Sequence, residues 1–295
     1  MHILKGYTKQ EISWMMYDWA NSAHSVIIVT LLPIFFDTVA GYTADSVSSM
    51  STWGYATSIA MLIVALAAPF LGVFGDIRGM RKKLFSFFML LGVAACAGMA
   101  FTPGMDFTSG PVAAGKVASL ILVLYIVSVI GFDASAIYYD AFLTDVTTEN
   151  RMDKVSTMGY GLGYIGGSTI PLLIFLIMNL VGVPMLTCLA FVFGLTAVWW
   201  LAFSLPLLKN CEQTSGKPYE KGDVARSIKG VGTTIKEIIA NKPMLIYILS
   251  YFFYIDGVHT VISMATTYGT NLGLDSTGMM LALLLVQILG LPFCL

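Results

Sequence analysis

Long apolar runs alternate with short polar connections along the whole chain. Eight of these runs approach the roughly 20 residues that an α-helix needs to cross a bilayer core about 30 Å thick. They cover residues 14–36, 52–74, 84–102, 117–139, 158–180, 184–205, 244–267 and 278–295. The pattern predicts an all-α integral membrane protein with six closely spaced spans, one long polar connection and two further spans.

The polar connection divides the chain into three expected domains. We expect an N-terminal six-helix transmembrane bundle at residues 1–205, a cytoplasmic linker at residues 206–243, and the first two helices of a second bundle at residues 244–295. Apolar residues recur at helical spacing in the linker, which predicts an amphipathic helix on the membrane or bundle surface. A solvated spacer with little helix fits the linker equally well. The apolar positions are Ile228, Val231, Ile235 and Ile238.

Composition agrees with a membrane location and excludes several classes of function. The chain is 57% hydrophobic and 11% charged, with a mean hydropathy of +0.80, whereas soluble domains are about 25% charged. A net charge of −1 gives no field that would attract nucleic acid. The four cysteines are scattered, without CxxC or Cys/His spacing, and HExxH, GxSxG and Walker-type motifs are missing. We therefore expect no metal, no cofactor and no enzymatic activity.

The basic residues indicate how the chain is oriented. Of the sixteen Lys and Arg residues, all except Lys116 fall in alternate connections. Basic residues concentrate in cytoplasmic loops. This distribution predicts a multi-pass protein of the cell membrane with its N-terminus in the cytoplasm.

Two of the apolar runs contain polar residues in helical stripes. A charged residue near the bilayer centre costs at least about 2.5–3.5 kcal/mol, so such stripes usually face a partner helix or a water-filled cavity. Spans one and seven are therefore expected to turn these residues toward a partner helix or a water-filled cavity. The residues are Asp18, Asn21, Ser22 and Ser25, with His24 beside them, in span one, and Asp256, His259, Thr260 and Ser263 in span seven.

The same two spans share a short sequence at matching positions. Span one contains NSAHSVI at residues 21–27, and span seven contains DGVHTVI at residues 256–262. Parallel repeats of this kind relate the two halves of major facilitator transporters. The match supports a chain built from a six-helix half followed by the start of a second half.

The connection after span two, GVFGDIRGMRKK at residues 72–83, resembles the major facilitator signature between the second and third helices. Gly72 would let two helices approach closely, and Gly79 would permit a tight turn. Asp76 and Arg81 would form a charge-assisted cytoplasmic latch that acts as a gate. The alternative is that the basic residues serve only as cytoplasmic anchors.

Five separated motifs resemble a more specific group, the "unknown major facilitator" family, which is related to the autophagy-related vacuolar amino-acid effluxers. The motifs are YDWANSA, YYDAFLTDV, VSTMGYGLGYIGG, YIDGVHTVI and LLVQILGLP. The resemblance implies a twelve-helix carrier of small solutes that works by alternating access, and it favours amino-acid efflux. It also implies four further helices, and it implies that spans one and seven flank a central pathway, which their polar residues would line. We therefore expect residues 1–295 to be a fragment that is inactive alone, or else a half-size carrier that pairs with a second chain.

The glycines of GLGYIG at residues 161–166 also match a dinucleotide-binding fingerprint. That fingerprint requires a preceding β-strand and an acidic residue about twenty positions later. Here an apolar span contains the glycines, and no acidic residue follows before Glu212. A smooth surface for close helix packing is the better interpretation.

The acidic residues in the spans favour one class of solute. Asp133 lies in span four, and no Lys or Arg lies inside any span. A zwitterion or cation could place its ammonium group against Asp256, which is the preferred contact, while histidine and carboxylates could carry protons. Asp18 fits a cytoplasmic gate or cap as well as a solute contact, and Asp133 could simply pair with a neighbouring helix. A channel or a non-transporting receptor of the same fold is the alternative function.

Overall fold

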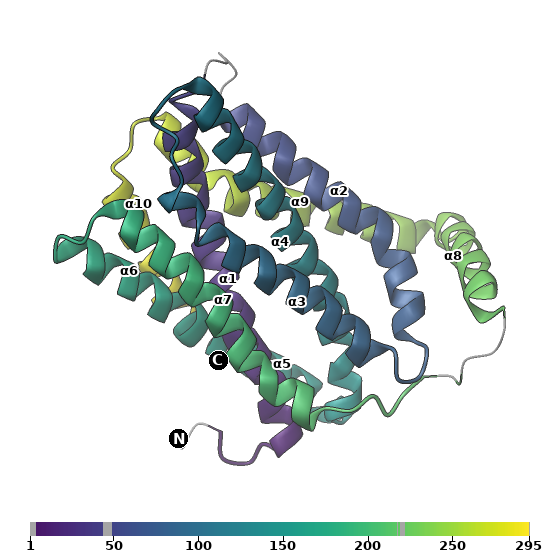
Figure 1. Cartoon of the computed structure of the whole chain (residues 1–295). Coiled ribbons are helices and arrows are strands. Elements are labelled where there is room, and N and C mark those ends of the chain that lie inside the picture. Colours follow the sequence, from purple (N-terminus) through teal and green to yellow (C-terminus); the bar gives the residue numbers. More distant parts are fainter. Residues whose placement is uncertain (1–3, 44–48, 217, 219–221, 295) are drawn as a thin grey trace.

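The computed structural model describes residues 4–43, 49–216, 218 and 222–294. The described chain is built from helices (Figure 1). In order they are α1 (Lys9–Ala40), α2 (Ser49–Gly75), α3 (Arg81–Met99), η1 (Thr102–Gly104), α4 (Pro111–Val146), η2 (Glu149–Arg151), α5 (Met152–Leu162), η3 (Gly163–Thr169), α6 (Ile170–Leu180), α7 (Met185–Asn210), α8 (Asp223–Ala240), α9 (Lys242–Asn271) and α10 (Ser276–Cys294). This architecture confirms the all-α membrane class.

Seven helical units among the described residues are long and apolar enough to cross a membrane. They are α1, α2, α3 with η1, α4, the continuous unit from η2 through α6, α7 and α9. The expected eighth span corresponds to α10, where the apolar stretch covers the shorter range Thr277–Gly290. Several helices are longer than the predicted spans. The 36 residues of α4 extend about 54 Å at about 1.5 Å per residue, so α4 projects beyond a bilayer core.

Helix α1 lies at the centre of the N-terminal bundle. It begins at a capping box in which Thr8 and Glu11 bond reciprocally to each other's backbone N–H. It then packs against α4, α5, η3 and α7, and it buries large side chains such as Tyr17, Ile27 and Phe35. A helix that is apolar on nearly all sides belongs in the interior, which explains why the bundle forms around α1.

Helices α9 and α10 pack on the outside of this bundle. Helix α9 touches α1 and α2, and α10 touches α5 and η3. The buried residues of α9 are Thr266, Thr267 and Gly269, all in its last turns. From Lys242 to Gly257, α9 has no buried residue. The helix is therefore held to the bundle near its C-terminal end only.

The linker contains helix α8, as its apolar spacing predicts, at the edge of the molecule (Figure 1). Ile235 is exposed, whereas Val231 and Ile238 are half-buried. The side chain of Ile228 lies outside the described residues.

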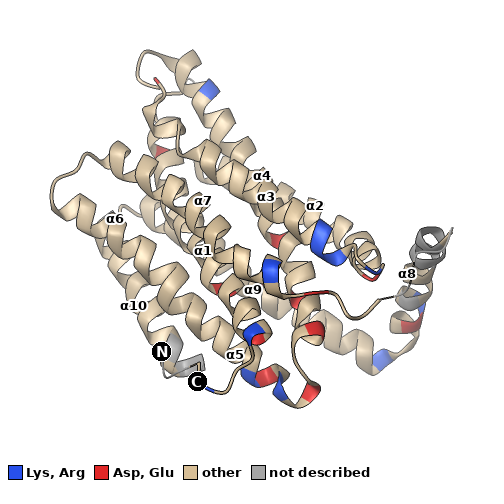
Figure 2. Ribbon diagram, turned by 60° about the horizontal axis from the view of Figure 1, so that its bottom comes forward, with Lys and Arg blue, Asp and Glu red and all other residues tan. Residues whose placement is uncertain are grey.

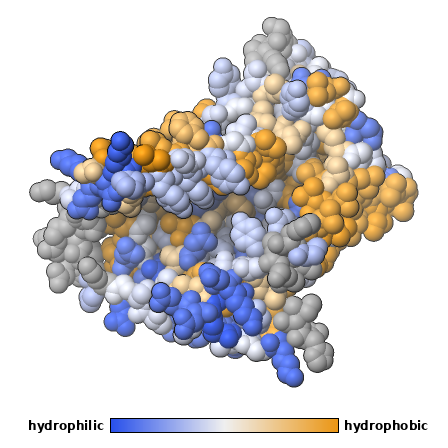
Figure 3. Space-filling view, turned by 180° about the vertical axis from the view of Figure 1, so that it is seen from behind, coloured by the Kyte–Doolittle hydropathy of each residue, from blue (hydrophilic) through white to orange (hydrophobic). Residues whose placement is uncertain are grey.

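Charged residues gather at one end of the bundle (Figure 2). We call this the basic end; it carries the start of α1, the α2–α3 turn with Arg78, Arg81, Lys82 and Lys83, and the start of α5 with Arg151 and Lys154. Lys116 lies near the start of α4, at the opposite end. Seen from behind, the molecule is hollowed between its upper and lower parts, with hydrophobic residues gathered on one side (Figure 3).

Candidate functional site

Asp18 of α1 is held by an aromatic pair. The Tyr139 hydroxyl of α4 donates a hydrogen bond to Asp18 Oδ2 at 2.7 Å. Tyr139 itself stacks on Trp14, with ring centroids 4.3 Å apart, and the Trp14 indole donates to the Tyr139 carbonyl oxygen at 2.8 Å. Two contacts thus fix the ring that binds the carboxylate. Asp18 has no cationic partner among the described residues.

The glycines of α5 and η3 pack directly onto this part of α1. A Cβ on Gly159 would lie 2.5 Å from Asp18 Oδ2, and one on Gly163 would lie 2.6 Å from Ser22 Oγ. A Cβ on Gly166 or Gly167 would overlap Trp19. The structure confirms the packing interpretation of these residues, because they lie inside a helix rather than in a loop after a strand. The helix becomes a π-helix over Gly163–Thr169, a feature that is frequent at functional sites.

His24 lies on a different side of α1 from Asp18 and Ser22. Its ring is 2% exposed and stacks on Phe132 at 4.8 Å. Its Nε2 is 3.2 Å from Ser128 Oγ, and Trp200 lies 5.2 Å away. The expectation that His24 lines the pathway is therefore wrong, because α1 turns this face toward α4 and α7. Asn21 is also buried, at 8% exposure.

Asp133 on α4 is an acid without a partner in the part of the chain that the structure describes. Its side chain is half-buried, and the Oδ2 atom is buried with no hydrogen-bond partner. No hydrogen bond or ion pair of this side chain occurs within the described ranges, so the alternative of pairing with a neighbouring helix finds no support. Two turns later on α4, at Tyr139 and Asp140, the helix contacts α1, where the Tyr139 hydroxyl bonds to Asp18.

The polar stripe of α9 lies apart from the residues of α1. Asp256, His259 and Thr260 are exposed, and Ser263 is half-buried. The Ser263 hydroxyl donates to the His259 carbonyl oxygen at 2.8 Å, whereas the Asp256 side chain has no partner among the described residues. Helix α9 meets the bundle at the opposite end, where Thr267 and Thr270 lie beside Pro33 and Trp53. Toward the basic end, the α9 stripe is open.

The turn between α2 and α3 confirms one glycine role and corrects another. Gly79 has a φ of +81°, which a residue with a side chain adopts only at a cost. Among the described residues, a Cβ on Gly72 would meet nothing within 4 Å, so no helix in that part of the chain approaches Gly72 closely. Gly75 lies at such an approach instead, because a Cβ there would lie 2.9 Å from the Tyr138 ring.

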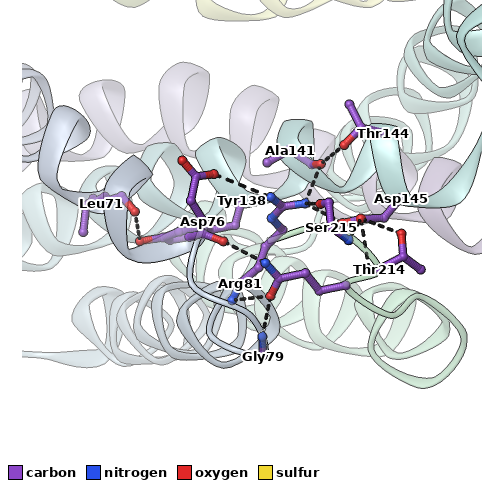
Figure 4. Close-up of polar contacts among 12 residues, drawn as sticks. Leu71, Asp76, Gly79, Arg81, Tyr138, Ala141, Thr144, Asp145, Thr214 and Ser215 are labelled. Carbon is purple, nitrogen blue, oxygen red and sulfur yellow. Dashed lines mark hydrogen bonds and ion pairs between the residues drawn. The ribbon is translucent and has the colours of Figure 1, made fainter. Parts of the chain in front are cut away.

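Arg81 pairs mainly with an acid that the sequence reasoning missed (Figure 4). Its Nη1 forms an ion pair with Asp145 and donates to the Ala141 carbonyl oxygen at 3.0 Å. The expected Asp76 contact is present at 3.8 Å, but the Asp76 side chain is 83% exposed, whereas the Arg81 side chain is 6% exposed and Asp145 is fully covered. A buried pair is screened far less than an exposed one. The sequence feature that could have revealed this partner is Asp145 itself, the last Asp of YYDAFLTDV, at the end of α4.

A second ion pair lies at the basic end, beside α1. Glu11, 1% exposed, receives two hydrogen bonds from Arg151 at 2.8 and 2.9 Å and one from Thr147 at 2.7 Å. This network joins the start of α1 to the end of α4 and the start of α5. The described residues contain no group of three His, Cys, Asp or Glu side chains placed to hold a metal.

Comparisons with known proteins show what the chain resembles. The family model described as "Vacuole effluxer Atg22 like" matches residues 42–151 and 143–292. The uncharacterized MFS-type transporter YxiO of Bacillus subtilis (strain 168) is 39% identical over 299 residues, which cover 99% of this chain and 67% of that protein. Autophagy-related protein 22-1 of Penicillium rubens is 26% identical over 148 residues, 46% of this chain and 25% of the relative. The corresponding protein of Aspergillus niger is 26% identical over 147 residues, 46% of this chain and 24% of the relative.

Proposed function

Because the chain belongs to the Atg22-like family of major-facilitator-type membrane transporters, we propose that it carries a small cationic or zwitterionic solute, with amino-acid efflux as the specific activity. Transport would proceed by alternating access and be coupled to protons. One observation carries the proposal. The acids Asp18 and Asp133 lie within the apolar helices α1 and α4, and neither has a cationic partner among the described residues.

An ammonium group is the chemical match for such a site. A buried carboxylate without a countercharge is costly in a membrane, and binding a cation or a proton removes that cost. The Tyr139 hydroxyl already satisfies one oxygen of Asp18 and leaves the rest of the carboxylate for a solute or proton. Asp256 of α9, exposed and without a partner among the residues described, would supply a further acid from the second bundle.

The charge distribution supports an orientation. We assign the basic end to the cytoplasm, because Lys and Arg concentrate in cytoplasmic loops, and this puts the N-terminus there, in a cell-membrane protein. Helix α9 is attached near the opposite end and exposed toward the basic end. The described arrangement would then correspond to an inward-facing state, in which residues 1–205 and 244–295 belong to two bundles joined by the linker.

The test is transport in proteoliposomes by an intact carrier that contains residues 1–295, because the chain alone is expected to be inactive or to need a second chain. Radiolabelled arginine, leucine and glutamate represent a cationic, a zwitterionic and an anionic amino acid. We expect saturable, gradient-dependent uptake of arginine or leucine and none of glutamate. Asp18→Asn, Asp133→Asn and Asp256→Asn should each lower uptake at least tenfold.

The matched control is Asp106→Asn. Asp106 is an exposed acid in the loop before α4, and it accepts backbone hydrogen bonds from Thr108 and Ser109 that asparagine can keep. Wild-type uptake in all three span variants would contradict the proposed site. An ohmic current in place of saturable uptake would favour the channel alternative, and glutamate uptake would contradict the solute class.

A further inference from the structure

The first residues of the linker cross the basic end and bind the α2–α3 turn. The segment Cys211–Gly216, which we call the strap, follows α7 directly. Gln213 Oε1 accepts hydrogen bonds from the Gly79 N–H at 2.8 Å and the Arg81 N–H at 3.3 Å. Gln213 Nε2 donates to the Gly75 carbonyl oxygen at 3.0 Å. One amide side chain therefore satisfies three backbone groups where α2 ends and α3 begins.

The next two residues of the strap bind the acid that holds Arg81. Asp145 Oδ1 accepts three hydrogen bonds, from Thr214 N at 3.0 Å, Thr214 Oγ1 at 2.9 Å and Ser215 N at 2.8 Å. The other carboxylate oxygen pairs with Arg81, and Ser215 Oγ accepts from Arg81 Nη1 at 3.2 Å. Figure 4 shows the strap residues Thr214 and Ser215 gathered with Arg81 around Asp145. Asp145 is thus shared between the gate and the linker.

Both ends of the strap are fixed. At its start, Lys82 Nζ donates to the Cys211 carbonyl oxygen at 3.1 Å, and the Cys211 thiol contacts the Gln10 carbonyl oxygen at 3.6 Å. Burial raises the pKa of this thiol to about 12, so it stays uncharged. At its end, Gly216 adopts a φ of +113° beside the Asp76 carbonyl oxygen, where a Cβ would come within 2.8 Å. The chain can turn away toward α8 there because the residue is glycine.

We propose that the strap is part of the cytoplasmic gate formed by the α2–α3 turn. Gln213 is the positioning residue: it keeps the Gly79–Arg81 turn and the Arg81–Asp145 ion pair in the arrangement that the protein has while the basic end is open. The strap is the beginning of the connection to α8 and α9, so movement of those helices acts on it through the chain. Contacts made in one state and lost in the other shift the equilibrium by their difference in free energy. The docked strap therefore favours the state with an open basic end.

The experiment measures accessibility, not transport. Gly257→Cys reports on the exposed first half of α9 in a Cys294→Ser background, since Cys96, Cys188 and Cys211 are buried. A membrane-impermeant maleimide is added from the basic side in inverted membrane vesicles. Gln213→Ala should lower the labelling rate at least threefold, and Gln213→Glu, which keeps the acceptor and loses the donor, should lower it less.

Two controls separate this role from general destabilisation. Glu212→Ala changes the neighbouring residue, which is exposed and without a partner among the described residues, and should label as the wild type does. A second reporter, Lys236→Cys on the exposed surface of α8, should be unaffected by Gln213→Ala. Should Gln213→Ala fail to fold, Thr214→Val removes one strap bond and should lower Gly257→Cys labelling in the same direction.

An unchanged Gly257→Cys labelling rate in the strap variants would overturn the proposal, as would an equal loss in Glu212→Ala or at Lys236→Cys. The inference rests on the proposed alternation between two states, but its readout needs no solute. If the strap variants lose Gly257→Cys labelling but no amino acid is taken up, the role of the strap is supported and the proposed solute is contradicted. If amino acids are taken up but the labelling rate is unchanged, the proposed solute is supported and the role of the strap is contradicted.

Discussion

Helices α1 and α9 carry similar seven-residue sequences, which share a His, a Val and an Ile at matching positions, in opposite surroundings. His24 in NSAHSVI is 2% exposed and enclosed by Phe132, Ser128 and Trp200. His259 in DGVHTVI is exposed, and only its backbone is bonded, by Ser263. The His24 ring of α1 is enclosed by neighbouring side chains, whereas the Asp256 and His259 side chains of α9 are exposed and have no partner among the described residues. A shared motif therefore indicates a shared position in a repeat, and packing decides what each copy does.

The largest effect expected from this difference comes from glycine substitutions. Gly167→Leu places a side chain against the Trp19 backbone, which cannot move aside as a flexible side chain would, and overpacking of this kind costs about 3 kcal/mol or more. Gly257→Leu on α9 meets nothing within 4 Å and should cost almost nothing. Yield and thermal unfolding in detergent measure both. Equal stability of the two variants would remove the distinction between the helices.

Removing the two histidine rings tests the comparison directly. His24→Ala empties a buried, aromatic-lined space and should lower the free energy of unfolding by about 2 kcal/mol. His259→Ala should stay within about 0.5 kcal/mol of the wild type, as surface substitutions do. Denaturant titration in mixed micelles, followed by tryptophan fluorescence, gives both values. A larger loss for His259→Ala would mean that α9 is packed more tightly than described.

The smallest effect is expected from one hydroxyl group. Tyr139→Phe removes the hydrogen bond to Asp18 and should cost about 1.5 kcal/mol, because bonds to charged groups are worth roughly 1.5–3 kcal/mol. Tyr254→Phe, on an exposed ring of α9, is the matched control and should be neutral. The same titration measures both variants. A neutral Tyr139→Phe would show that Asp18 does not depend on this donor.

The sequence was sufficient for the membrane class because about twenty apolar residues in a row have few other folded arrangements. Gly79 was also predictable, since a turn followed by basic residues required it. The sequence could not show which side of α1 turns inward, so His24 was placed on the pathway although neighbouring rings enclose it. It also could not show that Arg81 prefers Asp145 to Asp76, because that choice depends on burial. Nor do the polar residues of the strap follow any periodic pattern that would reveal what they bind.

The π-helical segment Gly163–Thr169 has a consequence for insertions and deletions. A π-helix holds one more residue in a turn than an α-helix, and here the Thr169 hydroxyl donates back to the Tyr164 carbonyl oxygen, five residues earlier, at 2.7 Å. Deleting one residue would let the chain return to α-helical phase. Six α-helical residues turn through nearly the same angle as the seven π-helical ones, so everything after the deletion would keep nearly its present orientation. Phe175 and Leu176 would therefore stay buried against the bundle, whereas deleting one residue from an α-helical part of the same unit would rotate the rest by about 100°. The π-helical segment is the place in this unit where the loss of one residue is best tolerated.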